Sequence, residues 1–316
     1  MSDSSRTTVG ILCGAGAGAL WGFVFLAPAL VQGTHPLNLT VGRYLCYGLV
    51  SLLLCLPRWR AVTSGLQASD WGALFKLTLI GNIVYYVCLS FAVQIGGIAL
   101  TSLIVGFLPV TVTVIGSRDA GALPLAKLRV PLALCVAGAV CIGWQALLAP
   151  VAGNVGRQVV GMGCAVGALL AWTWFAVHNG RHIKRLHTVS THDWNLLTGV
   201  MTGALALLLS PLAIFVADTH ASDLTVRLVA VSVTLSLAAS VLGNSLWNAM
   251  SRLLPMTLVG QMILFETLFA LLYGFVWEQR WPSPLEALAF VCVSLSVVTC
   301  VSAHRQPSQA RAPMGA

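Results

Sequence analysis

The sequence predicts an all-α polytopic membrane protein whose ten transmembrane helices form two inverted five-helix repeats. The first observation is composition: 58% of the 316 residues are hydrophobic and only 8% are charged, whereas soluble domains carry about 25% charged residues. The second is that apolar stretches long enough to cross a hydrocarbon core of ~30 Å recur along the whole chain. The third is that short motifs of the first half return, in the same order, in the second half.

The apolar stretches divide into ten spans of about 18–25 residues each. The uncharged stretch 77–117 is too long for one helix, so we expect it to fold back near residues 94–97, where two glycines permit a tight turn. A second short turn is expected at Leu254-Pro255-Met256. The spans are expected at residues 9–31, 38–56, 73–93, 97–116, 129–149, 159–178, 194–217, 226–248, 257–276 and 284–303.

Basic residues determine the expected orientation. With the amino terminus inside, 13 of the 17 Lys and Arg residues lie on one side, three lie on the other, and Arg43 lies within a span. The positive-inside rule then places both termini in the cytoplasm, with the chain in the inner or plasma membrane. The net charge of +8 belongs to these loops, so we expect no nucleic-acid partner. Tryptophans near span ends are expected at the membrane interface, namely Trp59, Trp71, Trp194, Trp277 and Trp281.

The two halves of the chain share motifs. Residues 9–21 align without a gap with residues 160–172, and both stretches end in tryptophan, Trp21 and Trp172. The later motif Gly-Asn-Ile-Val-Tyr at 81–85 recurs as Gly-Asn-Ser-Leu-Trp at 243–247. Because five spans is an odd number, the second half must cross the membrane in the opposite sense, as in many secondary transporters. The expected units are a first repeat at 1–149, a second at 150–303 and a disordered cytoplasmic tail at 304–316.

Glycines on the first span predict close helix packing. Gly10, Gly14, Gly18 and Gly22 recur every four residues. Small residues at this spacing let helix backbones approach closely. Either they serve packing alone, or they form a face on which spans one and six rock during transport.

Several short motifs resemble the EamA branch of the drug/metabolite transporter superfamily. The resemblance covers residues 9–303 and implies a ten-helix transporter that exports amino acids or other metabolites. Two positions depart from the family pattern: the stretch 116–118 lacks an acidic residue frequent in the family, and Glu266 stands at the position equivalent to Pro109. The motifs are Trp21-Gly22 ending the first span, Leu-Pro-Arg-Trp-Arg at 56–60, Leu108-Pro109-Val110, and Trp277-Glu278.

Polar side chains lie deep in the predicted spans, where a bilayer holds no water. Asn244 and Asn248 share one face of span eight, with Trp247 beside them. Asn82 and Tyr86 repeat this arrangement in span three. Two interpretations stay open. These groups form hydrogen bonds between helices, or they line a path for a solute that is partly apolar and partly polar.

Six aromatic side chains also lie well inside their spans, although lipid-facing aromatic residues prefer the interface. They therefore face either a packed core or a solute cavity. A cavity of this kind favours flat or apolar solutes such as aromatic amino acids. Trp144 is a weaker candidate for the same group. The six residues are Trp21, Trp172, Trp174, Tyr85, Tyr86 and Trp247.

Arg43 in span two and Glu266 in span nine are the only full charges far from a span end, and Gln261 lies near Glu266. A lone charge inside a membrane is costly, so such groups pair or face water. Three roles are compatible with the sequence: a static ion pair, recognition of a zwitterion, and proton coupling through Glu266. Solute binding is favoured over coupling.

The sequence offers no catalytic, cofactor or metal site. His178, His182, His187 and His192 are expected in a basic loop after span six, which would repel a metal cation. The nine cysteines are scattered and include no CxxC pair. Neither deep catalytic pairs nor a phosphate-binding loop for ATP is present.

We therefore expect a secondary transporter rather than an enzyme. It would export a small organic metabolite, such as an amino acid, by alternating access between its halves. A proton-coupled drug or multidrug exporter is the alternative, and an intramembrane enzyme or a channel has less support. The expected partners are the small-molecule solute and the lipid bilayer, and the protein acts as a monomer or a homodimer.

Overall fold

A computed structural model of the chain describes residues 3–25, 27–31, 34–89, 91–92, 104–119, 122–147, 155–186, 189–217, 222–279 and 281–305. Every regular element in these ranges is a helix, so the all-α class is confirmed for this part of the chain. The expected turn at 94–97 and the tail beyond residue 305 lie outside the described residues.

The helices follow one another with short connections. Those of the first half are α1 (Asp3–Gly22), η1 (Phe23–Phe25), α2 (Ala27–Leu30), α3 (Pro36–Cys55), η2 (Leu56–Arg58), α4 (Trp59–Thr63), α5 (Ala68–Thr78), η3 (Leu79–Val84), α7 (Leu108–Gly116) and α8 (Leu125–Leu147). Those of the second half are α9 (Val155–Arg185), α10 (Thr191–Phe215), α11 (Ser222–Leu235), η4 (Ser236–Gly243), α12 (Asn244–Leu253), α13 (Met256–Met262), α14 (Leu264–Glu278) and α15 (Pro284–Arg305).

Six helical stretches in the described residues are long and apolar enough to cross a membrane, which supports a polytopic membrane protein. A further apolar stretch, Met256–Ala270, is shorter. The six stretches coincide with predicted spans two, three, six, seven, eight and ten. They are Leu37–Thr63, Ala68–Leu89, Val159–Arg185, Thr191–Phe215, Thr225–Leu253 and Pro284–His304.

Local sequence explains several helix starts. Pro36 occupies the first turn of α3, where its missing N–H costs no hydrogen bond. At the start of α5, Gln67 and Asp70 form a capping box, in which each side chain accepts the other's backbone N–H. At the start of α10, the Ser190 hydroxyl accepts the Asp193 N–H at 3.0 Å.

Two predicted helix boundaries are wrong, and one predicted turn is confirmed. α9 continues to Arg185 instead of ending near residue 178, so His178 and His182 lie on a helix and not in a loop. The predicted span 257–276 is broken, because α13 ends at Met262 and α14 begins at Leu264. The turn at Leu254-Pro255-Met256 is confirmed, since α12 ends at Leu253 and α13 begins at Met256.

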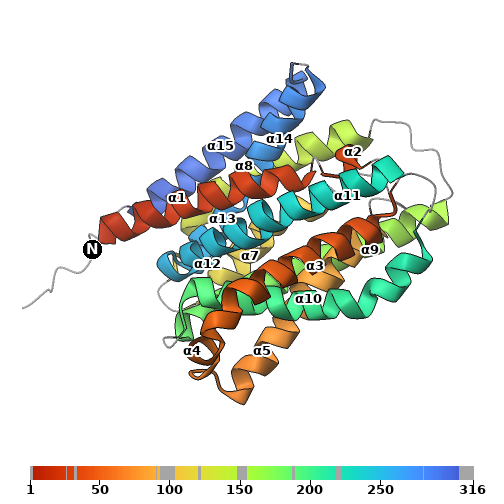
Figure 1. Cartoon of the computed structure of the whole chain (residues 1–316). Helices are drawn as coiled ribbons and strands as arrows, with labels where there is room; N and C mark the ends of the chain where they lie inside the picture. Colours follow the sequence, from red (N-terminus) through yellow and green to blue (C-terminus); the bar gives the residue numbers. More distant parts are fainter. Residues whose placement is uncertain are drawn as a thin grey trace, which may run out of the picture.

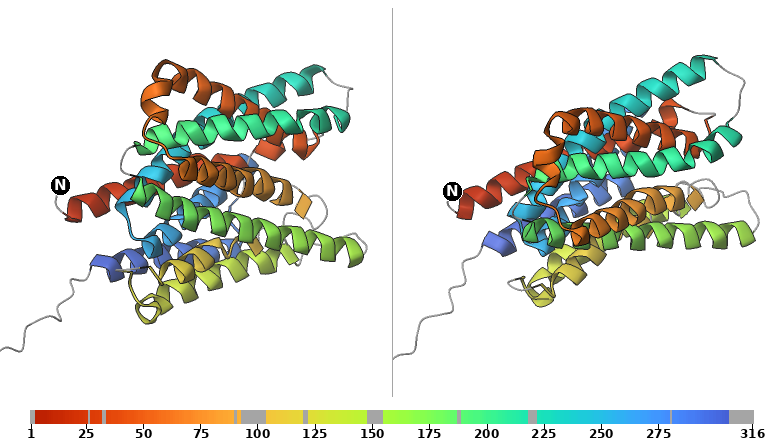
Figure 2. Two further views of the ribbon diagram at one scale, coloured as in Figure 1. Left: turned by 90° about the horizontal axis from the view of Figure 1, so that it is seen from below. Right: turned by 60° about the horizontal axis from the view of Figure 1, so that its bottom comes forward.

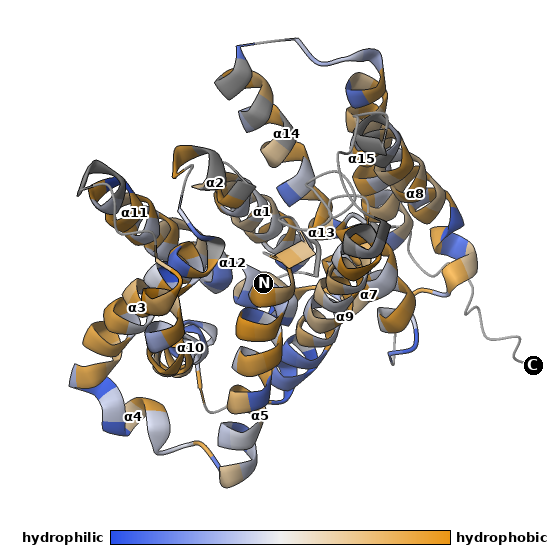
Figure 3. Ribbon diagram, turned by 90° about the vertical axis from the view of Figure 1, so that its right-hand side faces the viewer, coloured by the Kyte–Doolittle hydropathy of each residue, from blue (hydrophilic) through white to orange (hydrophobic). Residues whose placement is uncertain are grey.

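The long helices run side by side in one bundle (Figure 1), and two further views show the same arrangement (Figure 2). Viewed along the helices, α3, α10 and α11 stand on one side and α8, α14 and α15 on the other (Figure 3). The start of α1, the short α4 and the α12–α13 turn lie together at one end (Figure 1). This end is named the N-terminal end below.

Three helix pairs join the halves: α3 with α10, α8 with α15, and α7 with α13. In the first pair, Gly48 faces Gly203, and a Cβ added to either glycine would lie 2.5 Å from the Cα of the other. Glycine therefore permits a backbone approach that any larger residue would block. In the second pair, the Ser296 hydroxyl donates to the Pro131 carbonyl at 2.6 Å.

Further contacts between the halves involve α1 and α9. Helix α1 packs on α12 and α14, and α9 packs on η3 and α7. The glycines of α1 face these second-half helices: a Cβ added to Gly18 would lie 2.8 Å from the backbone nitrogen of Glu266. The predicted close packing of the first span is thus confirmed.

Helix α5 continues into the π-helical segment η3, and helix α11 continues into the π-helical segment η4. Segment η3 contains Gly81 and Asn82, and η4 ends at Gly243, directly before Asn244. The two Gly-Asn motifs therefore mark the same local distortion in both halves. π-helical turns are rare and are frequent at functional sites.

Candidate functional site

Three tryptophans meet in the interior, one from each of α1, α9 and α12. The ring of Trp21 lies 5.1 Å from that of Trp247 and 6.0 Å from that of Trp172, and Trp172 lies 5.3 Å from Trp247. All three side chains are buried. The group joins the first half to the second and is named the tryptophan cluster below.

The π-helical segment η4 provides space and a hydrogen-bond acceptor for Trp21. The Trp21 indole donates to the Ala239 carbonyl at 3.0 Å. A Cβ added to Gly243 would lie 2.7 Å from the same indole nitrogen. The glycine of this Gly-Asn motif is therefore needed because the indole packs directly on the backbone.

Arg43 lies beside the tryptophan cluster and is buried. Its Nε donates to the Ser240 hydroxyl at 3.1 Å. Its guanidinium carbon lies 5.5 Å from the ring centroid of Tyr44 and 5.4 Å from that of Tyr86, within the range of a cation–π interaction. Ser240 belongs to the second half, so both halves orient this cation.

Tyr85 connects the two groups of rings. Its centroid lies 6.4 Å from Tyr86 and 6.4 Å from Trp172. Tyr44 in turn lies 5.8 Å from Tyr86. The aromatic surface is thus continuous from the tryptophan cluster to the guanidinium of Arg43.

Glu266 lies in the first turn of α14, just after the break at Ile263, and is partly buried. Its carboxylate interacts electrostatically with Arg43 and with Tyr85. No N–O distance within 4.0 Å joins Arg43 to Glu266 among the described ion pairs. The two charges therefore face the same region without closing into a direct ion pair.

Further polar contacts link the helices of the two halves. Asn82 donates to the Thr202 hydroxyl at 2.7 Å. The Tyr47 hydroxyl donates to the Asn195 side-chain oxygen at 2.7 Å and also interacts with Asn244. Asn82 thus contacts α10, and Asn244 contacts α3. Both side chains form hydrogen bonds between helices.

Asn248 and Gln261 do not join the ring cluster through their hydrogen bonds. Asn248 accepts from Asn179 at 2.9 Å. Gln261 donates to the Thr113 hydroxyl at 3.2 Å and accepts from the Ser296 hydroxyl at 2.9 Å. Both are buried and paired, so their side chains bind neighbouring helices together.

Three further aromatic residues lie away from the tryptophan cluster. Trp194 is fully buried and donates to the Asn179 side-chain oxygen at 3.0 Å, so its ring packs inside the protein. Trp144 is 57% exposed on α8, where it does not face the cluster. Trp174 stacks on His178 at 4.3 Å.

Sequence reasoning missed a set of contacts at the N-terminal end. Arg181 pairs with Asp119, and His182 Nε2 lies 3.3 Å from an Asp70 carboxylate oxygen. Both pairs join α9 to the first half. Arg252 donates to the carbonyls of Ile183, Leu186 and Val189, which complements the C-terminal end of α9. These contacts are made by the C-terminal end of α9, which the sequence analysis predicted to be a loop.

The histidines of α9 were considered above as possible metal ligands. No group of three His, Cys, Asp or Glu side chains with metal-binding geometry occurs in the described residues.

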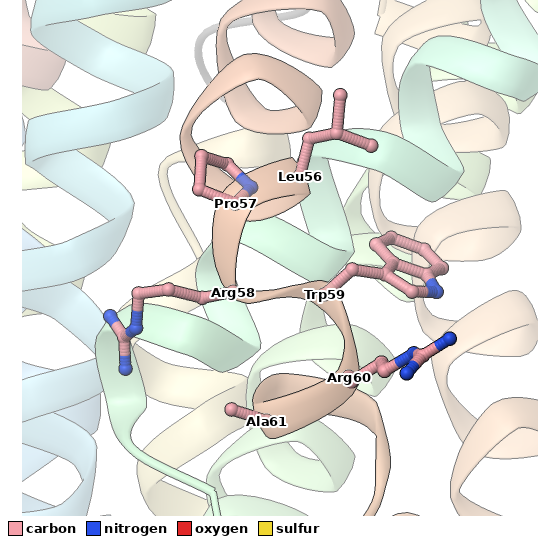
Figure 4. Close-up of a pocket in the computed structure, with 6 residues that line it drawn as sticks. All are labelled: Leu56, Pro57, Arg58, Trp59, Arg60 and Ala61. Atoms are coloured by element: carbon pink, nitrogen blue, oxygen red, sulfur yellow. The ribbon is translucent and has the colours of Figure 1, made fainter.

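A surface hollow of about 560 Å³ lies around residues 56–61, where η2 meets α4. Arg58 and Arg60 point in opposite directions there (Figure 4), so they do not converge on one ligand.

Residues 8–144 match the EamA-like transporter family, and this stretch contains Trp21, Arg43, Asn82, Tyr85 and Tyr86. The first half of the chain is therefore similar to that family. Its members are transporters, which supports a transport role and argues against an enzyme. The family match also confirms the resemblance drawn from the short motifs.

The relationship extends beyond the EamA-like half. The chain is homologous to the inner membrane protein YtfF of Escherichia coli (strain K12), with 28% identity over 315 residues that cover 93% of this chain and 95% of YtfF. A protein of known crystal structure has the same fold, with a TM-score of 0.72, 19% identity, and coverage of 97% of this chain and 100% of the other.

Proposed function

We propose that this protein is a secondary transporter of the inner membrane that exports a small zwitterionic metabolite, such as an amino acid. The similarity of residues 8–144 to a transporter family supports transport. The homology to YtfF, an inner membrane protein, supports the location. The observation that carries the solute class is the placement of Arg43 and Glu266 beside a continuous aromatic surface, without a direct ion pair between them.

The charges suit the two ends of a zwitterion. A carboxylate binds to a planar guanidinium through two parallel hydrogen bonds. Glu266 is placed to interact with an ammonium group, and the rings of Tyr85 and Trp172 offer an apolar surface to a side chain. A solute with both charges satisfies two groups that would otherwise remain costly to bury.

We further propose ten spans arranged as two inverted repeats of five, at 1–149 and 150–303, with both termini in the cytoplasm. The matching distortions at η3 and η4 support this symmetry. So do the contacts, since α1 packs on second-half helices as α9 packs on first-half helices. In alternating access, the contacts of α9 with Asp70 and Asp119 would separate to open the N-terminal end.

A second candidate is proton-coupled export of a drug-like apolar molecule. It is favoured by one observation, namely that Glu266 has no direct cation partner within 4.0 Å among the described ion pairs. An acidic side chain inside a membrane-spanning segment is a recurrent element of proton relays in transporters. In that case protonation of Glu266 would alternate with binding of the solute.

Transport in proteoliposomes tests the proposal. The purified protein is reconstituted, and uptake and efflux of a panel of amino acids are measured with and without a pH gradient. Saturable exchange of an amino acid is the expected result. Transport of no amino acid, together with pH-driven transport of a drug-like apolar molecule, would support the second candidate instead.

A further inference from the structure

Trp247 differs from other buried tryptophans in the state of its indole N–H. Trp21 donates to the Ala239 carbonyl, and Trp194 donates to Asn179. The Trp247 side chain is equally buried, with 2% of the residue exposed, but its Nε1 has no hydrogen-bond partner among the described residues. Buried donors are nearly always paired in native proteins, so this one needs a physical reason.

Packing of the ring does not supply that reason. Trp247 contacts the rings of Trp21 and Trp172 at centroid distances of 5.1 and 5.3 Å. A side chain without an N–H would provide similar ring contacts and would bury no unpaired donor. The corresponding position of the other half is Tyr85, which also combines an aromatic ring with a polar hydrogen.

We propose that Trp247 is a specificity-determining residue of the transport site, whose indole N–H donates to a carboxylate or carbonyl oxygen of the solute. This inference rests on the proposed function. The residue lies on α12 between α1 of the first half and α9 of the second. Its neighbour Asn248 is already paired with Asn179, which leaves the N–H as the unpaired donor of this pair of residues.

The unpaired donor gives the site a means of discrimination. In the described conformation the N–H is buried and unpaired, and the Trp247 ring contacts the rings of Trp21 and Trp172. A solute that enters the tryptophan cluster with an acceptor oxygen provides a hydrogen bond that the protein itself does not. An otherwise similar solute without that oxygen leaves the donor buried and unpaired, and it is rejected for that reason.

The direct test replaces the Trp247 indole by a benzothiophene, which keeps the ring system and substitutes sulfur for N–H. Wild-type and substituted proteins are reconstituted in proteoliposomes, and the half-saturation concentration for L-phenylalanine exchange is measured. We expect an increase of about tenfold, the effect of losing one hydrogen bond to a charged acceptor. Trp247→Phe should show at least the same increase.

Trp194→Phe is the matched control, because Trp194 is fully buried and its N–H is paired within the protein. It should lower the melting temperature and leave the half-saturation concentration unchanged. The benzothiophene at position 247 should raise the half-saturation concentration and leave the melting temperature unchanged, because no hydrogen bond within the protein is lost.

The outcomes separate the two claims. If the wild type transports L-phenylalanine and the benzothiophene protein has the same half-saturation concentration, the role of Trp247 is wrong and the proposed function stands. If the folded wild type exchanges no amino acid of the panel, both the proposed function and this inference are wrong.

Discussion

Arg43 illustrates how single residues prepare this site. Its guanidinium lies over two tyrosine rings and donates to Ser240 from the other half of the chain. These contacts fix the orientation of the cation before a solute arrives, which reduces the ordering cost of binding. Glu266 is less constrained, because it interacts with Arg43 and Tyr85 over a longer distance.

Glu266→Gln should separate solute binding from proton coupling. The change keeps the shape of the side chain and removes its charge. Because we assign Glu266 to the ammonium group of the solute, the half-saturation concentration for amino-acid exchange should rise by about tenfold or more. The response of transport to an imposed pH gradient should stay as in the wild type.

Both quantities are measured on the same proteoliposomes. Unchanged affinity combined with the loss of pH-driven transport would instead assign Glu266 to proton coupling. Wild-type behaviour in both measurements would remove Glu266 from the transport site.

The sequence predicted many of the residues that the structure brings together around Arg43 and the tryptophan cluster, but not their hydrogen-bond partners. Deep aromatic residues and full charges are visible in a sequence because a bilayer penalises them there. Thus Trp21, Trp247 and Arg43 were found. Hydrogen-bond partners on distant helices leave no such pattern, so the pairing of Asn248 with Asn179, and of Gln261 with Thr113, became visible only in three dimensions.

At the scale of elements, six of the ten predicted spans coincide with long apolar helices in the described residues, but polar residues led to one wrong helix end. The stretch after His178 is rich in His, Lys and Arg and was read as a loop. It is helical to Arg185, and its polar side chains contact residues of the first half, as in the pairs of Arg181 with Asp119 and His182 with Asp70. The break in the ninth span likewise has no proline or glycine at Ile263 to announce it.

The α3–α10 pair should be sensitive to the size of its glycines. Gly203→Leu would force a side chain into the Cα of Gly48, so we expect a loss of about 1–3 kcal/mol or more in the free energy of unfolding. Gly163→Leu is the matched control, because an added Cβ there meets no atom within 4 Å. Thermal unfolding in detergent measures both. Equal melting temperatures for the two variants would refute the predicted tight contact.

The contacts of α9 at the N-terminal end should control access from that side. Arg181→Gln removes the pair with Asp119, whereas Arg185→Gln changes an exposed residue on the same helix turn. In a cysteine-free background, a cysteine at the buried position of Ser251 should react faster with a maleimide after Arg181→Gln and not after Arg185→Gln. Equal labelling rates would show that this ion pair does not hold the end closed.

For the whole molecule, composition alone predicted the class of protein and the family motifs predicted transport. Hydrophobic residues predominate along the helices (Figure 3), and many large apolar side chains, such as Leu208, Phe215 and Val226, are exposed, as expected for a chain surrounded by lipid. The number of spans, the inverted repeat and the orientation stay predictions. The shared Gly-Asn motifs gave the first indication of the repeat, and the distortions at η3 and η4 now add a structural counterpart.

The central claim is that the site between the halves binds a zwitterion, and competition for exchange tests it most directly. Exchange of labelled L-phenylalanine into proteoliposomes is measured with an excess of unlabelled L-phenylalanine, phenethylamine or 3-phenylpropionate. These compounds carry both charges, only the ammonium, and only the carboxylate, respectively. We predict strong competition by L-phenylalanine alone, because only this compound pairs with both Arg43 and Glu266. Equal competition by phenethylamine or 3-phenylpropionate would contradict the account.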